Sequence, residues 1–231
     1  MKCISPNWPA PANIKAFTTT RQSIGDIDLK HPKERQSLTR LFALPEEPIW
    51  INQVHSAIAI EALPENQDKT ADALFTNKPN HLCAVLTADC LPILICNRQG
   101  THIAAIHAGW RGLANGIVEQ TLEQLPIAGQ DLLVWLGPAI GPGKFEVGSD
   151  VLEAFTHHDP EASRAFAPQP GAKWLADLYQ LARLRLHKYG INEIYGGNFC
   201  THSQSDLFFS YRRDQGKTGR MASIIWVSPP P

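Results

Sequence analysis

Short apolar runs bounded by Gly, Pro, Asn or Asp constrain the fold of this chain more than any other feature. Runs of this kind are typical of β-strands, and nearly continuous hydrophobicity is typical of strands covered on both faces. The expected strands are Ile49–Val54, Leu82–Thr87, Ile93–Cys96, Ile103–Ile106, Leu132–Leu136, Ile194–Gly196 and Ser223–Val227.

Segments with helical spacing lie between these runs. Gly112–Leu125 and Lys173–Tyr189 each place their apolar residues on roughly one stripe. Asp150 and Glu153 resemble a capping box that opens a helix over Val151–Phe155. Strands that alternate with helices predict an α/β protein with a mixed sheet. Because no linker separates independent parts, we expect residues 1–231 to form a single domain.

Charge and hydrophobicity argue against two classes of partner. A net charge of -1 does not favour nucleic-acid binding, which normally requires a basic face. One basic cluster, Arg212, Arg213, Lys217 and Arg220, can bind a small anion but is too short to follow a duplex. No apolar run approaches about 20 residues, so we expect no transmembrane helix and no membrane partner.

The cysteines indicate a reducing compartment. The chain has five of them, an odd number, and no pair has CxxC spacing, so we expect no disulfide framework. The N-terminus lacks the apolar segment of a signal peptide. These features predict a cytoplasmic protein with reduced thiols.

Three potential metal ligands follow expected strands. His55 follows the expected strand Ile49–Val54, Cys90 follows Leu82–Thr87, and His107 follows Ile103–Ile106. Loops at strand ends are where α/β proteins place their chemistry. Two imidazoles and one thiolate suit Zn²⁺, and three protein ligands with a fourth position open are typical of a catalytic zinc site. Copper binds such sites more tightly in water, so Cu²⁺ is the alternative.

Polar residues near these ligands are further candidates. Arg111 lies between two glycines in a strand-to-helix turn, where it can bind an anion. Asp89 adjoins Cys90 and can transfer a proton, or it can be a loop carboxylate satisfied by backbone N–H groups. Asp72 is a second acid, and Cys200 either lines the same pocket or is an inert buried thiol.

Eight stretches, together with Cys200, form one ordered set: WINQVHS (50–56), ADA (71–73), LTADCLP (86–92), HAGWRG (107–112), WLGPAIG (135–141), FEVG (145–148), FSYRR (209–213) and GRM (219–221). This set resembles the YfiH-type laccase-domain family. Members of that family are variously called multicopper polyphenol oxidase, purine nucleoside phosphorylase or peptidoglycan editing factor.

The resemblance implies a layered α/β/β/α fold with mixed β-sheets and a metal held by His55, Cys90 and His107. It implies a catalytic domain for zinc-dependent phosphorolysis of adenosine, inosine, guanosine and methylthioadenosine, and for deamination of adenosine. The partners would be a purine nucleoside and phosphate, bound by a monomer or weak homo-oligomer. The expected catalytic residues are Asp89, Cys90 and Arg111, and the expected substrate-binding residues are Arg21, Asp72, Cys200, Arg212, Arg213 and Arg220.

One segment departs from the family pattern, and other activities stay open. Residues 22–29 form a shorter loop than family members carry at this position. Copper-dependent phenol oxidation is disfavoured, because the chain has only two methionines and no HxH pair for further copper ions. A Cys–His hydrolase that edits peptidoglycan precursors would use Cys90 as nucleophile and His107 or His55 as base. A binding module would leave these ligands without a role.

Overall fold

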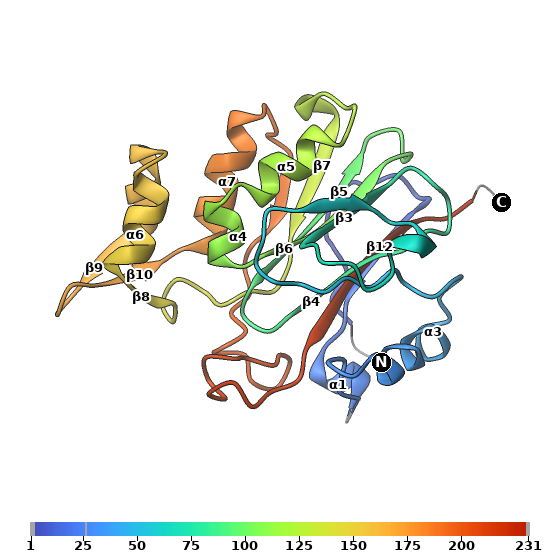
Figure 1. Cartoon of the computed structure of the whole chain (residues 1–231), viewed down its shortest axis with the longest axis horizontal. Coiled ribbons are helices and arrows are strands. Elements are labelled where there is room, and N and C mark those ends of the chain that lie inside the picture. Colours follow the sequence, from blue (N-terminus) through green and yellow to red (C-terminus); the bar gives the residue numbers. More distant parts are fainter. Residues whose placement is uncertain (1–2, 26, 230–231) are drawn as a thin grey trace.

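The computed structural model describes residues 3–25 and 27–229, which form four layers in the order helix, sheet, sheet, helix (Figure 1). The central layer is a six-stranded mixed sheet. Its strands in spatial order are β11 (Ile194–Gly196), β7 (Leu132–Leu136), β5 (Leu91–Asn97), β6 (Ile103–Ala108), β3 (Ala73–Thr76) and β2 (Ala59–Glu61). The expected α/β/β/α order with mixed sheets is confirmed.

A second sheet packs on one face of the first. It is antiparallel, in the order β1 (Ile14–Thr18), β12 (Met221–Val227) and β4 (Cys83–Thr87). Buried side chains fill the space between the two sheets, among them Val85, Leu94, Ala105, Trp135 and Ile225. The outer face of the second sheet is covered by α1 (Arg21–Ile24), α2 (Pro32–Arg35), α3 (Ser37–Leu41) and their connections.

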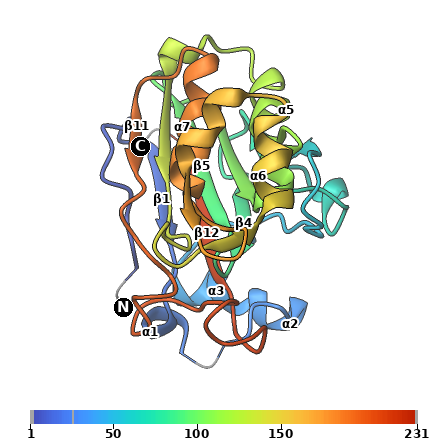
Figure 2. The ribbon, with the colours of Figure 1, turned by 90° about the vertical axis from the view of Figure 1, so that its left-hand side faces the viewer.

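Helices α4 (Trp110–Ala114), α5 (Ile117–Glu123) and α7 (Leu178–Lys188) cover the other face of the six-stranded sheet (Figure 2). Helix α6 (Ser149–Thr156) stands beside a small antiparallel sheet of β8 (Glu146–Gly148), β10 (Lys173–Ala176) and β9 (Phe166–Gln169). Short 3-10 helices span Pro64–Asn66, Gly129–Asp131 and Pro160–Ala165. No helix among the described residues is long and apolar enough to cross a membrane.

Strand β6 shows why the central strands have no polar face. Ala104 and Ile106 belong to the core beneath the helices, whereas Ile103 and Ala105 belong to the core between the sheets. This alternation follows from the two-residue period of a strand. Every residue of β5 and β6 is buried, so the prediction of strands covered on both faces is confirmed.

Two of the expected elements differ near the site. The segment Ile49–Val54 is not a strand, since its backbone forms only isolated bridges at Ile49 and Asn52. The helix expected over Gly112–Leu125 is interrupted at Gly116, whose φ of 93° lies in the left-handed region that favours glycine. The other six expected strands are present.

Two further expectations of local structure are wrong. The segment Lys173–Tyr189 begins as strand β10, and the helix starts only after Asp177, whose side chain accepts a hydrogen bond from the backbone of Gln180. Helix α6 is present, but its N-cap is Gly148, so there is no capping box. The shortened segment 22–29 contains most of α1, and its Asp26 lies outside the described residues.

Candidate metal centre

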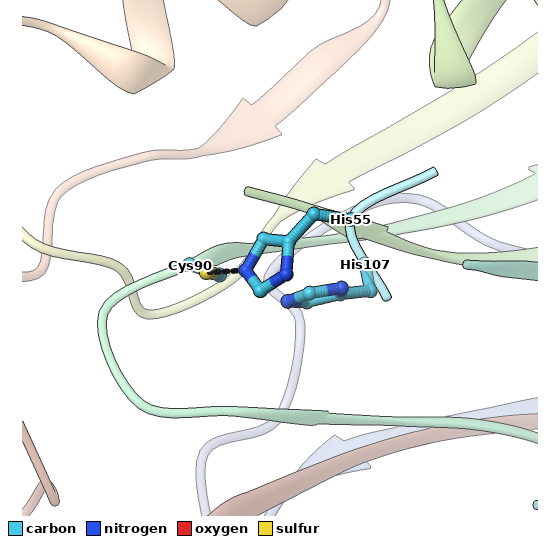
Figure 3. A group of neighbouring side chains, drawn as sticks. All are labelled: His55, Cys90 and His107. Atoms are coloured by element: carbon cyan, nitrogen blue, oxygen red, sulfur yellow. Dashed lines mark hydrogen bonds between the residues drawn. The ribbon is translucent and has the colours of Figure 1, made fainter. Parts of the chain in front are cut away.

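His55, Cys90 and His107 come together in the fold. Their ligand atoms all lie within 4.8 Å of one another (Figure 3). The Cys90 Sγ atom is 3.6 Å from His55 Nε2, and the two imidazole rings meet edge to face. Within residues 3–25 and 27–229, this is the one group of three such side chains that could hold a metal ion.

Each ligand is held by a different local structure. Cys90 lies in the tight connection between β4 and β5. His107 is inside β6, opposite Pro92, and not beyond the strand end. His55 lies in a loop with a φ of 62°, an uncommon conformation for a residue with a side chain. The expectation that all three ligands follow strands is therefore correct only for Cys90.

Asp72 holds two of the ligands from behind. Its fully buried carboxylate accepts a 2.7 Å hydrogen bond from Nδ1 of His107. It also accepts hydrogen bonds from the backbone N–H groups of His55 at 3.0 Å and Ser56 at 2.6 Å. The bond to Nδ1 leaves Nε2 of His107 free to act as a ligand, the usual arrangement at metal sites. Asp72 was expected to bind substrate, but the structure places it beneath the ligands.

The side chains of this cluster shift one another's pKa values. Burial raises the pKa of Cys90, but the adjoining His107 and His55 outweigh burial and lower it to about 6. Burial lowers the pKa of His107, whereas Cys90 and Asp72 raise it to about 9. Burial raises the pKa of Asp72, yet hydrogen bonds from His107 and Ser56 hold it at about 2. Once His107 has lost its proton, the thiolate of Cys90 beside two imidazoles is a ligand set that fits Zn²⁺.

Two glycines bring the backbone against the ligands. A Cβ atom at Gly109 would lie 2.4 Å from His55 Cδ2 and 3.1 Å from Cys90 Sγ. A Cβ atom at Gly112 would lie 2.9 Å from the backbone oxygen of Ser56. At these two positions the backbone therefore approaches the ligand loop too closely for a side chain.

A cavity of about 870 Å³ opens over the three ligands, and its charged lining is mostly basic. The cationic side chains are Lys30, Arg35, Arg111, Arg212 and Arg220, whereas the carboxylates are Asp68 and Asp89. The aromatic lining consists of Trp110, Phe145 and Tyr211. The cavity therefore combines a potential metal site with groups that attract anions and groups that pack against flat rings.

The three expected cavity arginines are held in different ways. The Arg111 guanidinium lies 4.4 Å from the centre of the Trp110 ring. Arg212 donates a 3.0 Å hydrogen bond from Nη1 to a backbone carbonyl of β8. Arg220 donates a 2.9 Å hydrogen bond from Nη1 to the carbonyl of Gly219. Each arginine thus has a defined position at the cavity wall.

Asp89 joins the Cys90 connection to a distant loop. Its carboxylate accepts hydrogen bonds from Thr201 Oγ1 at 2.5 Å, Ser210 Oγ at 3.0 Å and the backbone N–H of Arg212 at 2.7 Å. Both carboxylate oxygens are therefore engaged. This geometry matches the alternative interpretation of Asp89 as a loop carboxylate whose hydrogen bonds are satisfied. Two of its three donors are hydroxyl groups of residues distant in sequence, Thr201 and Ser210.

Besides Asp72, three expected substrate-binding residues do not line the cavity. Arg21 is exposed and lies over the ring of Phe209. The Arg213 guanidinium donates to backbone carbonyls of its own loop region. Cys200 lines a separate cavity of about 480 Å³, and its Sγ accepts a hydrogen bond from the backbone N–H of Gly141.

Several residues that shape the site were not identified from the sequence. Lys30 and Arg35 belong to a polar segment without a periodic pattern, so no signal marked them. Gln53 exchanges two 2.8 Å hydrogen bonds with the backbone of Leu86, which ties the His55 loop to β4. Gln53 could have been identified from its position two residues before His55 in the WINQVHS motif.

Comparisons with known proteins agree over nearly the whole chain. The model of a family described as multi-copper polyphenol oxidoreductase laccase matches residues 16–228. A purine nucleoside phosphorylase of Haemophilus influenzae is 45% identical, with 98% of this chain and 99% of the relative covered. Purine nucleoside phosphorylase YfiH of Escherichia coli is 47% identical, with the same coverage of both chains.

Solved structures show the same fold. Protein NMB0706 of Neisseria meningitidis superimposes with a TM-score of 0.91 at 41% identity, covering 99% of this chain and 100% of that protein. YlmD of Geobacillus stearothermophilus superimposes with a TM-score of 0.85 at 28% identity, covering 96% of this chain and 94% of that protein.

Proposed function

The chain belongs to the multi-copper polyphenol oxidoreductase laccase family, and within that family we propose that it is a zinc-dependent purine nucleoside enzyme. Its reactions would be the phosphorolysis of adenosine, inosine, guanosine and methylthioadenosine, and the deamination of adenosine. The observation that carries this proposal is the mostly basic cavity that opens directly over His55, Cys90 and His107. The relatives named purine nucleoside phosphorylase support the same substrate class.

We assign the zinc to His55, Cys90 and His107, with Asp72 as the positioning residue that orients His107. A bound zinc would supply Lewis acidity at the floor of the cavity. Asp89 would act through the backbone of Arg212, which it holds beside the cavity. Three donors occupy three of the roughly four acceptor positions of the Asp89 carboxylate, so a proton transfer by Asp89 would use the remaining position on Oδ1.

The wall of the cavity would bind the two substrates. Arg111, Arg212 and Arg220 would receive phosphate, since guanidinium groups match the geometry of phosphate oxygens. The rings of Trp110 and Tyr211 would pack against the flat purine. Attack by phosphate on the glycosidic carbon breaks the bond to the base, which leaves with those electrons and takes up a proton.

The remaining features of the proposal concern the whole protein. Residues 1–231 would act as one catalytic domain in the cytoplasm, as a monomer or weak homo-oligomer, without a nucleic-acid or membrane partner. The hydrophobic cores support a single domain because they share sheets. The six-stranded sheet contributes side chains to the core beneath the helices and to the core between the sheets. The sheet of β1, β12 and β4 contributes to the core between the sheets and to the core beneath the N-terminal helices.

The test is chromatographic analysis of products from adenosine and the zinc-loaded protein, with and without phosphate, beside Cys90→Ala. We expect adenine that depends on phosphate, and inosine that does not, from the unaltered protein only. Circular dichroism establishes that Cys90→Ala is folded. Adenine from the folded variant at the rate of the unaltered protein would place the chemistry away from the metal site, and the absence of both products would refute the proposal.

Copper-dependent phenol oxidation is a second candidate, and the description of the family favours it. The described residues do not offer an axial methionine, because Met221 lies in β12 and its sulfur accepts a hydrogen bond from the backbone of Phe209. Oxygen uptake with a phenol, compared between copper-loaded and zinc-loaded protein, separates the two candidates. Oxidation with copper and no nucleoside cleavage with zinc would favour the oxidase.

A Cys–His hydrolase is a third candidate, favoured by the lowered pKa of Cys90 beside His107 and His55. Such a thiolate is a nucleophile when no metal occupies it. Mass spectrometry after incubation with an activated ester distinguishes this candidate, because a hydrolase forms a covalent acyl group on Cys90. Zinc that abolishes labelling while it supports nucleoside cleavage would favour the nucleoside enzyme.

A further inference from the structure

A second cavity adjoins the cavity over the metal ligands. This second cavity, of about 650 Å³, lies between the N-terminal helices and the segment that precedes β4. The two cavities share three lining residues, Pro32, Arg35 and Asp68. Arg35 has the only long side chain of the three, so its side chain forms the movable part of the boundary between the cavities.

The Arg35 side chain is held across this boundary by identifiable contacts. Its Nε atom donates a 2.8 Å hydrogen bond to the carbonyl of Leu29. Its guanidinium lies 5.5 Å from the centre of the Trp50 ring, within the range of a cation–π contact. Asp68 provides an opposite charge beside it. These contacts fix the guanidinium in place without making it part of the protein core.

The second cavity differs in character from the first. Its lining includes four prolines and Ile49, together with the polar residues Gln36, Gln67, Asn80 and His81, whereas Trp50 and Leu82 border it with almost no exposed surface. Proline rings give a wall with few conformations, because they fix the backbone and lack rotatable side-chain bonds. The charged lining contains the carboxylates Glu46, Glu47 and Asp68, which repel phosphate. This compartment therefore suits a rigid, uncharged group better than an anion.

We propose that Arg35 is a specificity-determining residue that separates the metal cavity from this compartment and so limits the size of the nucleoside that the enzyme accepts. The proposal rests on the proposed nucleoside activity. Removing the Arg35 side chain would join the two cavities and admit nucleosides with a flat aromatic substituent. Such a substituent would lie among the prolines and Trp50 while the reacting bond stays beside the metal ligands.

The experiment compares kcat/KM for adenosine with that for two larger nucleosides, N6-benzyladenosine and 5′-benzylthioadenosine. They carry the same ring at opposite ends of the molecule. In Arg35→Ala we expect the ratio of the larger to the plain substrate to rise about tenfold for at least one of them, the usual scale for an added apolar contact. Lys33→Ala, an exposed position on the same helix outside both cavities, serves as the matched control.

Three outcomes would overturn the inference: an unchanged ratio in Arg35→Ala, an equal rise in Lys33→Ala, or an unaltered protein that already cleaves the benzyl nucleosides as well as adenosine. Failure of the proposed function is distinct from these, because then adenosine itself is not cleaved by the unaltered protein. If circular dichroism shows that Arg35→Ala is unfolded, Arg35→Leu tests the same point. Leucine is much shorter than arginine and lacks the hydrogen bond to Leu29, but it keeps an apolar side chain beside Trp50.

Discussion

Gly109 is the residue whose replacement most directly tests the geometry of the metal centre. The Cβ atom of Gly109→Ala would lie 2.4 Å from the His55 ring and 3.1 Å from Cys90 Sγ, so the geometry of these two ligands must change. We expect zinc affinity to fall by at least about tenfold, the scale seen when outer contacts of a metal site are altered. Titration with Co²⁺, followed by the thiolate-to-cobalt absorption, measures this loss in the absence of substrate.

Gly143→Ala is the matched control for this prediction. A Cβ atom at Gly143 would meet nothing within 4 Å, and the position has no positive φ. Its cobalt titration should therefore match that of the unaltered protein. If Gly109→Ala binds cobalt as tightly as Gly143→Ala, the His55 loop is free to move and the close approach of the backbone has no role in binding.

At the residue scale, the sequence predicted those site residues whose role depends on residues adjacent to them in sequence. Cys90 adjoins an acid and His107 is close to two glycines in sequence, so part of their surroundings could be predicted from neighbouring residues. The position of Asp72 behind His107 was not predictable, because it depends on the pairing of β3 with β6. The same holds for Asp89, whose hydroxyl donors lie more than a hundred residues away in sequence.

At the scale of elements, Tyr179 of α7 anchors the loop that follows β7. Its buried hydroxyl accepts a 2.8 Å hydrogen bond from the backbone N–H of Ala139 and contacts the carbonyls of Gly137 and Phe199 at 3.1 and 3.0 Å. Tyr179→Phe leaves these buried groups without their partner. We expect the free energy of unfolding to fall by about 1–3 kcal/mol, measured by urea denaturation.

The control for this prediction is Tyr189→Phe at the end of the same helix. Tyr189 is exposed, and its hydroxyl is 3.5 Å from a carboxylate oxygen of Glu123. Removal of an exposed hydroxyl should change the unfolding free energy by no more than about 0.5 kcal/mol. Equal effects at Tyr179 and Tyr189 would show that the buried hydroxyl does not hold the loop.

The elements that were predicted correctly are those whose pattern is decided locally. Strands β5 and β6 are buried on both faces, so nearly all of their residues are apolar and their identity is plain from composition. The segment Ile49–Val54 is also rich in apolar residues but lacks a ladder of partners, and its Gln53 bonds to β4 through the side chain instead. Strand pairing is a property of two segments, which a single run of residues does not contain.

At the scale of the whole molecule, metal binding should stabilise the fold. The three ligands come from a loop, a strand connection and a strand that are distant in sequence, so an unfolded chain does not present them together. Free zinc at about 100 times its dissociation constant should add about 2.7 kcal/mol to the unfolding free energy. For a chain of this length, that raises Tm by about 5–10 °C in a thermal scan. Cys90→Ala should show no such rise.

The stabilisation should also depend on pH, because metal binding displaces protons from the ligands. His107 has a pKa of about 9 without metal, so between pH 6 and 9 it must lose a proton, and zinc affinity should rise about tenfold per pH unit. Below pH 6 the Cys90 thiol is protonated as well, so the affinity should fall at least about a hundredfold per unit. Calorimetric titration from pH 5 to 8 in two buffers of different protonation enthalpy measures both the affinity and the protons released. A zinc affinity that stays constant from pH 8 down to pH 5 would mean that neither proton leaves on binding, and that His107 and Cys90 are not ligands of the metal.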